Sequence, residues 1–383
     1  MILVDRTRHL AGLQFCPRAR YWEYEYEGVG GQGKALSIPP ATGKAFHRAI
    51  EPLLKALKET GEFPPRLQAR GLILVAVQEY QKEASAAGLR NGQTADSEHV
   101  SEEAAWLITE QSTLVEGLAW AFWRSLLPFL SREFEIVAIE QEVNYVLGCD
   151  CGLGDGTVGE VAWEDVEGGA DLQHEHRQCS GVALMIRPDL ITRQLSSGAV
   201  AVWDFKTSAS DWQPKEMDHL VQLAIGVTGA GEVVGEPCTQ HYLVGLHKGQ
   251  RKSDDREGKG MKRQRSPFCQ VYYKPADPPY GEAEYQAAYT RRKGWGRVPV
   301  WEIEFPEQDK EEAGSSAVEH WVLDLMGAEE VASKCSLNGP TQAPVHLIPR
   351  ILKEVEAETR YWKDVMAAVV EDPEGLDTYV RRS

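Results

Sequence analysis

The stretch "RPDLITRQLSSGAVAVWDFKTS", residues 187–208, sets three ionisable side chains among apolar, β-prone residues. The polar turn "QLSSG" separates two apolar runs, and this pattern predicts an antiparallel hairpin. In the second strand, alternation puts Asp204 and Lys206 on one face and the intervening Phe205 on the other. Pairing of the two strands then brings Asp189 towards Asp204.

Two carboxylates that lie close together repel each other unless one takes up a proton or a cation lies between them. Oxygen ligands suit Mg²⁺ or Mn²⁺, which would keep positions for water and a phosphate oxygen. Lys206 could stabilise charge that develops on the phosphate or orient the attacking water. The hairpin therefore indicates a metal site for phosphodiester hydrolysis. The alternative is a solvated polar face, because charged residues mostly lie in water.

Composition sets limits on the partners. The chain has 383 residues, of which 42% are hydrophobic, enough for one elaborated domain or two. A net charge of −17 disfavours a generic anion-binding surface, so nucleic acid would need a local basic stripe. The start, "MILVDRTRHLAGLQF", carries frequent charges, and no later segment approaches the ~18 apolar residues that span a bilayer. We expect a cytoplasmic protein with no membrane contact, whose seven scattered cysteines are reduced.

The region from Thr42 to about residue 130 predicts helices. "TGKAFHRAIEPLLKALKET" repeats apolar residues at helical spacing, with Thr42 as the expected N-cap. His47 falls at the edge of the buried face, where a packed core histidine is the ordinary interpretation. Further helices are predicted through "LILVAVQEYQKEA" and "SEEAAWLITEQSTLVEGLAWAFWRSLLPFL".

From Phe134 the period changes from helical to β. "FEIVAIEQEVNYVL" and "GVALMIRPDLIT" each predict a strand, and "QHYLVGLH" predicts another. Between them, "PKEMDHLVQLAIGVTGA" predicts a helix that carries Gln222. The C-terminal third is mixed and ends in a predicted helix, "LIPRILKEVEAETRYWKDVMAAVV".

The ordered set of Pro188-Asp189, a turn, Asp204-Phe205-Lys206 and Gln222 resembles the PD-(D/E)xK nuclease superfamily, and most closely its RecB-like branch. Three other stretches add to this resemblance. "GKAFHRAIEPLL" is similar to the G-x-x-x-H helix of that branch. "IEQEVNY" resembles a strand whose acidic residue leans towards the metal, and "HLVQLAIG" resembles the Q-x-x-x-Y helix.

The resemblance implies roles for individual residues. His47 would be a metal ligand, and the acid of the strand would be Glu140 or, as the less favoured choice, Glu142. Gly226 stands where the family usually has tyrosine, and no nearby residue clearly replaces that tyrosine. The implied metal ligands are His47, Asp189 and Asp204, with Lys206, Gln222 and Glu140 in catalytic roles and Mg²⁺ or Mn²⁺ as the cofactor.

The implied fold is an α/β, restriction-endonuclease-like core, in which helices flank a central mixed sheet and a helical insertion precedes the core. Four segments are expected: a Cys-Pro and aromatic segment (1–41), the His helix with the helical insertion (42–131), the nuclease core (132–250), and a basic loop with a mixed region that completes the domain (251–383).

The implied activity is that of a metal-dependent DNA exonuclease that acts on ends or single strands in recombination, repair or phage DNA processing. The alternatives are a structure-specific endonuclease, a CRISPR-adaptation end-trimming nuclease, and a non-catalytic DNA-binding subunit. No G-x-x-x-x-G-K-[ST] motif occurs in the sequence, so any ATP-driven unwinding would come from a helicase or recombination partner.

"FCPRARYWEY", with Cys16, resembles the first cysteine segment of iron-sulfur RecB-like nucleases, including CRISPR-adaptation and AddB-type proteins. Four thiolates are needed for such a cluster, and only the distant Cys269 and Cys335 lie beyond the core, so we expect none. A structural zinc is a further candidate, with a polar insertion loop as the alternative. Its ligands would be Cys149, Cys151, His174, His176 and Cys179.

The best candidate for substrate contact is "KGQRKSDDREGKGMKRQR", residues 248–265, with eight basic residues against three acids. Its low apolar content predicts an exposed, flexible loop, for which a solvated charge run is the ordinary interpretation. In an acidic chain it is also a place where phosphates could bind, together with "RARYWEY" near the N-terminus. The expected phosphate-binding residues are Lys248, Arg251, Lys252, Lys262, Arg263 and Arg265.

Overall fold

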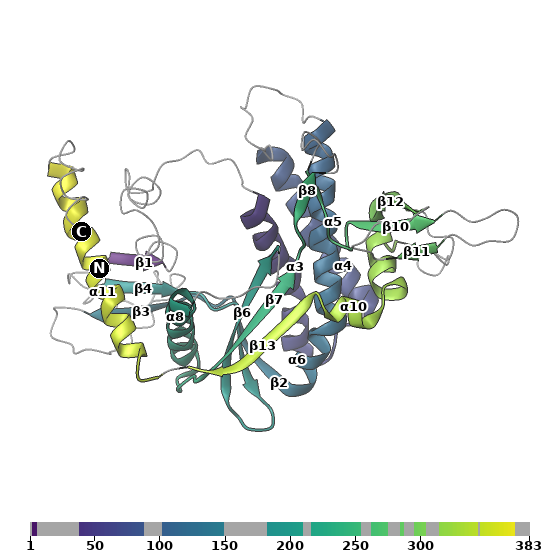
Figure 1. Cartoon of the computed structure of the whole chain (residues 1–383). Coiled ribbons are helices and arrows are strands. Elements are labelled where there is room, and N and C mark those ends of the chain that lie inside the picture. Colours follow the sequence, from purple (N-terminus) through teal and green to yellow (C-terminus); the bar gives the residue numbers. More distant parts are fainter. Residues whose placement is uncertain are drawn as a thin grey trace, which may run out of the picture.

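A computed structural model gives the architecture of the chain (Figure 1). It describes residues 2–5, 38–87, 102–148, 182–209, 216–253, 262–274, 284–286, 295–303, 314–343 and 345–371. Among the described helices, none combines enough length with enough apolar character to cross a membrane.

The centre of the molecule is a five-stranded mixed sheet in the order β13-β7-β6-β5-β2. The pairs β13–β7, β6–β5 and β5–β2 are antiparallel, and β6–β7 is parallel. This confirms the predicted α/β fold with a central mixed sheet, and β5 and β6 form the predicted hairpin. The strands are β2 (Phe134–Ile139), β5 (Leu190–Gln194), β6 (Val200–Ser208), β7 (Gln240–His247) and β13 (Cys335–Gln342).

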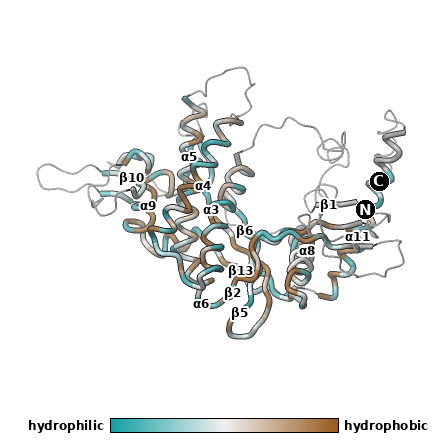
Figure 2. Tube along the Cα trace, turned by 180° about the vertical axis from the view of Figure 1, so that it is seen from behind, coloured by the Kyte–Doolittle hydropathy of each residue, from teal (hydrophilic) through white to brown (hydrophobic). Residues whose placement is uncertain are grey.

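Helices cover both faces of this sheet. Trp203 and Phe205 point into a large apolar cluster with the helices α3, α4 and α5, whereas Val202, on the other face of β6, packs with Leu223 and Val227. Figure 2 shows hydrophobic segments where these helices meet the sheet. The helices are α3 (Ile38–Thr60), α4 (Arg66–Ala87), α5 (Glu102–Ser125), α6 (Leu127–Glu133) and, on the second face, α8 (Glu216–Val234).

Smaller sheets flank this core. Beside α8 lies a three-stranded sheet, β1-β4-β3, against which α11 packs. The ribbon β8–β9 lies alongside α5, and the sheet β11-β10-β12 lies beyond that helix (Figure 1). Their strands are β1 (Ile2–Asp5), β3 (Val143–Gly148), β4 (Val182–Ile186), β8 (Arg251–Ser253), β9 (Lys262–Gln264), β10 (Gln270–Lys274), β11 (Glu284–Gln286) and β12 (Gly296–Pro299). The remaining helical elements are η4 (Val300–Glu302), α9 (Ala317–His320), η6 (Trp321–Leu325), α10 (Ala328–Ala332) and α11 (Ile348–Glu371).

Three local predictions were wrong. Thr42 does not cap its helix: α3 begins at Ile38, and the buried Thr42 hydroxyl donates a hydrogen bond to Gln111 Oε1 at 2.9 Å. The residues 134–147 and 181–192 do not form single strands. Each run breaks in its middle and contributes to two different sheets.

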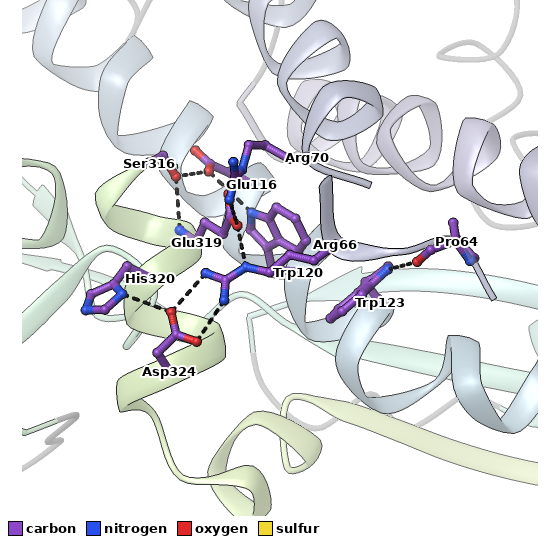
Figure 3. Close-up of polar contacts among 10 residues, drawn as sticks. All are labelled: Pro64, Arg66, Arg70, Glu116, Trp120, Trp123, Ser316, Glu319, His320 and Asp324. Carbon is purple, nitrogen blue, oxygen red and sulfur yellow. Dashed lines mark hydrogen bonds and ion pairs between the residues drawn. The ribbon is translucent and has the colours of Figure 1, made fainter. Parts of the chain in front are cut away.

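An ion cluster fastens the segment α9–η6 to the helical block (Figure 3). Glu319 of α9 is 1% exposed and receives hydrogen bonds from Arg66 Nε at 2.6 Å and Arg70 Nε at 2.7 Å. Arg66 also donates two bonds of 2.9 Å to Asp324. Hydrogen bonds from guanidinium groups to carboxylates are stronger than hydrogen bonds between neutral groups. This cluster therefore ties together two segments that are about 250 positions apart in sequence.

Glu116 of α5 lies beside this cluster and should make stability depend on pH. Burial raises its pKa from 4.5 to about 7, and the negative charge of Glu319 adds to the rise, while hydrogen bonds from Ser316 and Trp120 oppose it. Between these two pKa values the folded chain holds a proton that the unfolded chain has released, so stability falls as pH rises through this window. Glu116→Gln is uncharged at every pH and can still accept both hydrogen bonds.

We therefore expect the free energy of unfolding of the wild type, relative to Glu116→Gln, to fall by roughly 3 kcal/mol between pH 4.5 and about pH 8. Urea titrations of both proteins across this range measure the difference. Glu329→Gln, an exposed change on α10, is the matched control for the loss of a carboxylate. A pH-independent difference for Glu116→Gln would show that folding does not raise the pKa of Glu116.

Candidate active site

Two strand breaks bring two carboxylates together. The chain passes from β2 to β3 at Glu140 and from β4 to β5 at Pro188-Asp189, and at both places it leaves one sheet for another. Pro188 has no N–H to donate to a ladder, so it suits such a break. The two breaks are joined by a hydrogen bond of 3.1 Å from Glu140 N to Asp189 O.

Glu140 has a φ of +48°, in the left-handed region that residues other than glycine rarely adopt. Its side chain can therefore depart from the alternation of a regular strand. Strained backbone of this kind clusters at functional sites, where the surrounding structure maintains it. Here the hydrogen bond to the Asp189 carbonyl fixes the turn and directs the Glu140 carboxylate towards α3.

His47, on α3, faces both carboxylates. Its Nε2 lies 3.1 Å from Phe205 O, and because a carbonyl oxygen can only accept, Nε2 carries a hydrogen and donates it. The other nitrogen, Nδ1, lies 3.0 Å from Glu140 Oε1 and 3.8 Å from Asp189 Oδ1. Burial lowers the pKa of His47, but the charges of Asp189 and Glu140 outweigh this effect and raise the pKa to about 8.

His47, Glu140 and Asp189 form a group that could hold a metal ion, because one ligand atom of each lies within 4.8 Å of the others. The fixed donor role of Nε2 leaves Nδ1 as the atom that can coordinate. A hydrogen bond of this type at the second nitrogen is usual for metal-binding histidines. One imidazole nitrogen and two carboxylates fit a divalent cation such as Mn²⁺ or Mg²⁺.

Asp204 and Lys206 lie beside this group on β6. Lys206 Nζ donates a hydrogen bond of 2.6 Å to Asp204 Oδ1, so the two side chains share a face as the alternation predicts. Phe205 N, between them, donates to Asp189 Oδ2 at 2.7 Å and ties Asp189 to the strand. Burial and the charge of Asp204 raise the pKa of Asp189. Such crowding of carboxylates favours a bound cation or proton.

A cavity of about 240 Å³ opens beside these acids, and Asp189, Asp204, Gln222, Gly226 and His241 are among the residues that line it. The buried Oε1 of Gln222 has no hydrogen-bond partner among the described residues. It is therefore available to a water or a substrate group. No tyrosine is among the described residues around the cavity, and a side chain at position 226 would meet Val202 first.

The comparison with known families agrees with this arrangement. The sequence profile described as the PD-(D/E)XK nuclease superfamily matches residues 8–333, which include α3, the β5–β6 hairpin and α8. The chain belongs to the PD-(D/E)XK nuclease superfamily. Nucleases of this superfamily use divalent metals, which accords with the group on α3 and the two strand breaks. No curated protein gives a significant match to this nuclease.

Sequence reasoning missed Arg187 at the edge of the site. Its Nε lies 2.9 Å from Glu140 Oε2, although its side chain is 56% exposed. The only signal in the sequence was that Arg187 directly precedes Pro188-Asp189. This position does not indicate a pairing with Glu140 unless the strand break at Glu140 is known. Glu142, the alternative acid of the strand, is exposed.

The basic stretch of the nuclease differs from the exposed, flexible loop that its composition predicts. Its described parts form the ribbon β8–β9, which includes Arg251, Lys252, Lys262 and Arg263. The ribbon docks on α5, because Gln264 N donates a 2.6 Å hydrogen bond to the buried Glu110, and Arg263 lies 5.2 Å from the centre of the Trp106 ring. Lys252 is exposed, Arg265 is partly buried, and burial lowers the pKa of Lys248.

Several predictions fall outside the described residues. They concern Cys16 with its aromatic neighbours, and the candidate zinc ligands Cys149, Cys151, His174, His176 and Cys179. Cys269, on the other hand, is buried, and its Sγ donates to Glu110 O at 3.4 Å. Cys335 is partly buried in β13.

Proposed function

We propose that this nuclease is a metal-dependent DNA exonuclease of the RecB-like branch that acts on DNA ends or single strands in recombination, repair or phage DNA processing. The observation that carries the proposal is the convergence of His47, Glu140 and Asp189 within 4.8 Å, next to the Asp204–Lys206 pair. An imidazole, carboxylates and a lysine that lie close together are suited to hydrolysing a phosphodiester.

His47, Glu140 and Asp189 would hold the metal, with Asp204 as a further oxygen ligand once Lys206 turns to the substrate. A bound divalent cation supplies a water of lowered pKa and polarises a phosphate oxygen. The carboxylates favour Mg²⁺, whereas the imidazole of His47 favours Mn²⁺. Both ions therefore fit this group of ligands. Arg187 holds Glu140 in place from the solvent side.

Lys206 has two tasks in this proposal. Its ammonium group lies 2.6 Å from Asp204, which lines the same cavity as Gln222. From there it can orient the attacking water and stabilise the negative charge that grows on the phosphate oxygens. Gln222 assists by accepting a hydrogen bond from the water through Oε1, which has no other partner among the described residues.

The RecB-like assignment is supported by Gly43 and His47 on α3. Gly43 lies close to the strand that carries Asp204 and Lys206, because a Cβ at this position would be in ordinary van der Waals contact with Thr207 Oγ1 of β6, at 3.4 Å. One turn later, His47 reaches the backbone of that strand through Nε2. Both ends of the G-x-x-x-H motif thus lie against β6 in this chain.

A cleavage assay tests the function. Linear double-stranded, linear single-stranded and covalently closed circular DNA are incubated with the nuclease in Mg²⁺, in Mn²⁺ and in EDTA. We expect metal-dependent loss of linear DNA while circles survive, because an exonuclease needs an end. Cutting of circles would replace the proposal with an endonuclease, and binding without cleavage in either metal would replace it with a non-catalytic subunit.

A further inference from the structure

A second cavity, of about 490 Å³, lies between the ribbon β8–β9 and the sheet β11-β10-β12. Its volume is within the range of ligand-binding sites. We call it the arginine pocket, and the side chains that matter here are Arg263, Arg265, Gln270, Tyr272, Trp295 and Arg297.

The arginine pocket is lined by positive charge, although the chain as a whole is acidic. Three arginines from two segments line it, and no acidic residue is among its described lining residues, although the chain carries a net charge of −17. Guanidinium groups bind phosphate through two parallel hydrogen bonds. A concave surface with one sign of charge concentrates oppositely charged ligands, so the pocket is suited to a phosphate.

Gln270 gives an independent indication of a ligand. The residue is 6% exposed, and its buried Oε1 has no hydrogen-bond partner among the described residues. Leaving a buried polar atom unsatisfied costs free energy. Because Gln270 lines the arginine pocket, a ligand with an N–H group, such as a nucleobase edge, would satisfy it.

Aromatic rings complete the walls. Arg297 is exposed, its guanidinium carbon lies 5.3 Å from the centre of the Tyr272 ring, and its Nη2 donates to Tyr272 Oη at 3.0 Å. Trp295, which is partly buried, adds a larger ring to the lining. Tryptophan and arginine planes are the surfaces on which unpaired bases stack in single-strand-binding proteins.

We infer that the arginine pocket binds one nucleotide of a single DNA strand, with the phosphate at Arg265 and Arg297, the base against Trp295, and the base edge at Gln270. A paired base has its edge occupied and its faces stacked, so the pocket selects single strands over duplex. The inference rests on the proposed function, because it takes DNA as the substrate and names the form that the nuclease holds.

The position of the arginine pocket gives it a use. Its strands β10 and β12 lie on one side of the helices α3, α4 and α5, and α8, which carries Gln222, lies on the other (Figure 1). The view from behind shows the same separation (Figure 2). A strand held there therefore crosses the helical block before it reaches Asp204. The pocket acts as a remote grip that keeps one end of the substrate bound during successive cuts.

The test is direct binding by the full chain with Lys206→Ala, in EDTA, so that no cleavage occurs. Fluorescence anisotropy is measured with a labelled single strand, its duplex, and an abasic strand of equal length. We expect Arg297→Gln to weaken single-strand binding about tenfold and to reduce the slope of log K against log salt by about 0.7. Arg132→Gln, which removes an exposed arginine on α6, is the matched control.

The base contacts are tested separately. Gln270→Met and Trp295→Ala should each weaken binding of the base-bearing strand but leave the affinity for the abasic strand and the salt slope unchanged. Trp295→Phe should restore most of the affinity that Trp295→Ala loses. Unchanged affinity in Arg297→Gln, or an equal loss for duplex, overturns the inference. Cleavage by the chain with Lys206 intact reports the proposed function independently, and melting temperatures show that each variant is folded.

Discussion

Lys206→Ala should lower the rate of DNA cleavage by roughly 10²–10³-fold, because it removes the group that stabilises charge on the reacting phosphate. Asp204→Asn should cause a loss of similar size, since it keeps the shape of the side chain but removes the charge that pairs with Lys206 at 2.6 Å. Asp204 is buried in the middle of β6, but asparagine keeps its shape, and Lys206 is only partly buried. The fold should therefore survive both changes. The measurement is single-turnover cleavage of end-labelled linear DNA at saturating metal.

Lys55→Ala is a suitable control for Lys206→Ala. Lys55 is an exposed lysine on α3, and it is also paired with a carboxylate, Glu51 Oε1 at 2.8 Å. Its loss changes the net charge by the same amount but touches nothing at the strand breaks. If Lys206→Ala cleaved as fast as Lys55→Ala, the lysine would have no part in the chemistry, and the Asp204–Lys206 pair would be structural.

The parts of the site that could be predicted from sequence are those set by local periodicity. Alternation in "AVAVWDFK" placed Asp204 and Lys206 on the same face, and helical spacing placed His47 at the margin of an apolar face. The resemblance then connected the two, and the hydrogen bond between His47 Nε2 and Phe205 O shows the contact. These features depend on the repeat of single elements, which a sequence records directly.

The parts that could not be predicted depend on where elements break and dock. "FEIVAIEQEVNYVL" alternates without interruption, and nothing in it indicates that Glu140 takes a left-handed conformation and starts a new sheet. The basic stretch has the composition of a solvated loop, but Glu110 and Trp106 of α5 bind its two-stranded base. The strand break at Glu140 and the docking of the basic stretch both depend on contacts with residues more than 40 positions away. A local sequence pattern does not record such contacts.

Glu319→Ala should have the largest effect on stability. Glu319 is 1% exposed and binds two arginines, so its removal leaves Arg70, itself 9% exposed, as a buried charge without its main partner. Breaking one side of a buried ion pair costs about 3–5 kcal/mol. We expect a loss of that size in the free energy of unfolding, measured by urea denaturation near neutral pH. Glu284→Ala, which breaks the exposed pair with Lys274, should cost less than about 1 kcal/mol.

A double-mutant cycle separates the ion pair from mere packing. In Arg70→Met the charge is gone, so replacing Glu319 by alanine in that background should cost much less than in the wild type. Equal costs in both backgrounds would show that the cluster in Figure 3 contributes through shape alone. Because Arg66 and Arg70 lie on α4 and Glu319 lies on α9, the coupling measures how firmly the segment that leads into β13 is fastened to the helices. β13 pairs with β7, which lies next to β6, so the segment that Glu319 anchors leads into the sheet that carries Asp204.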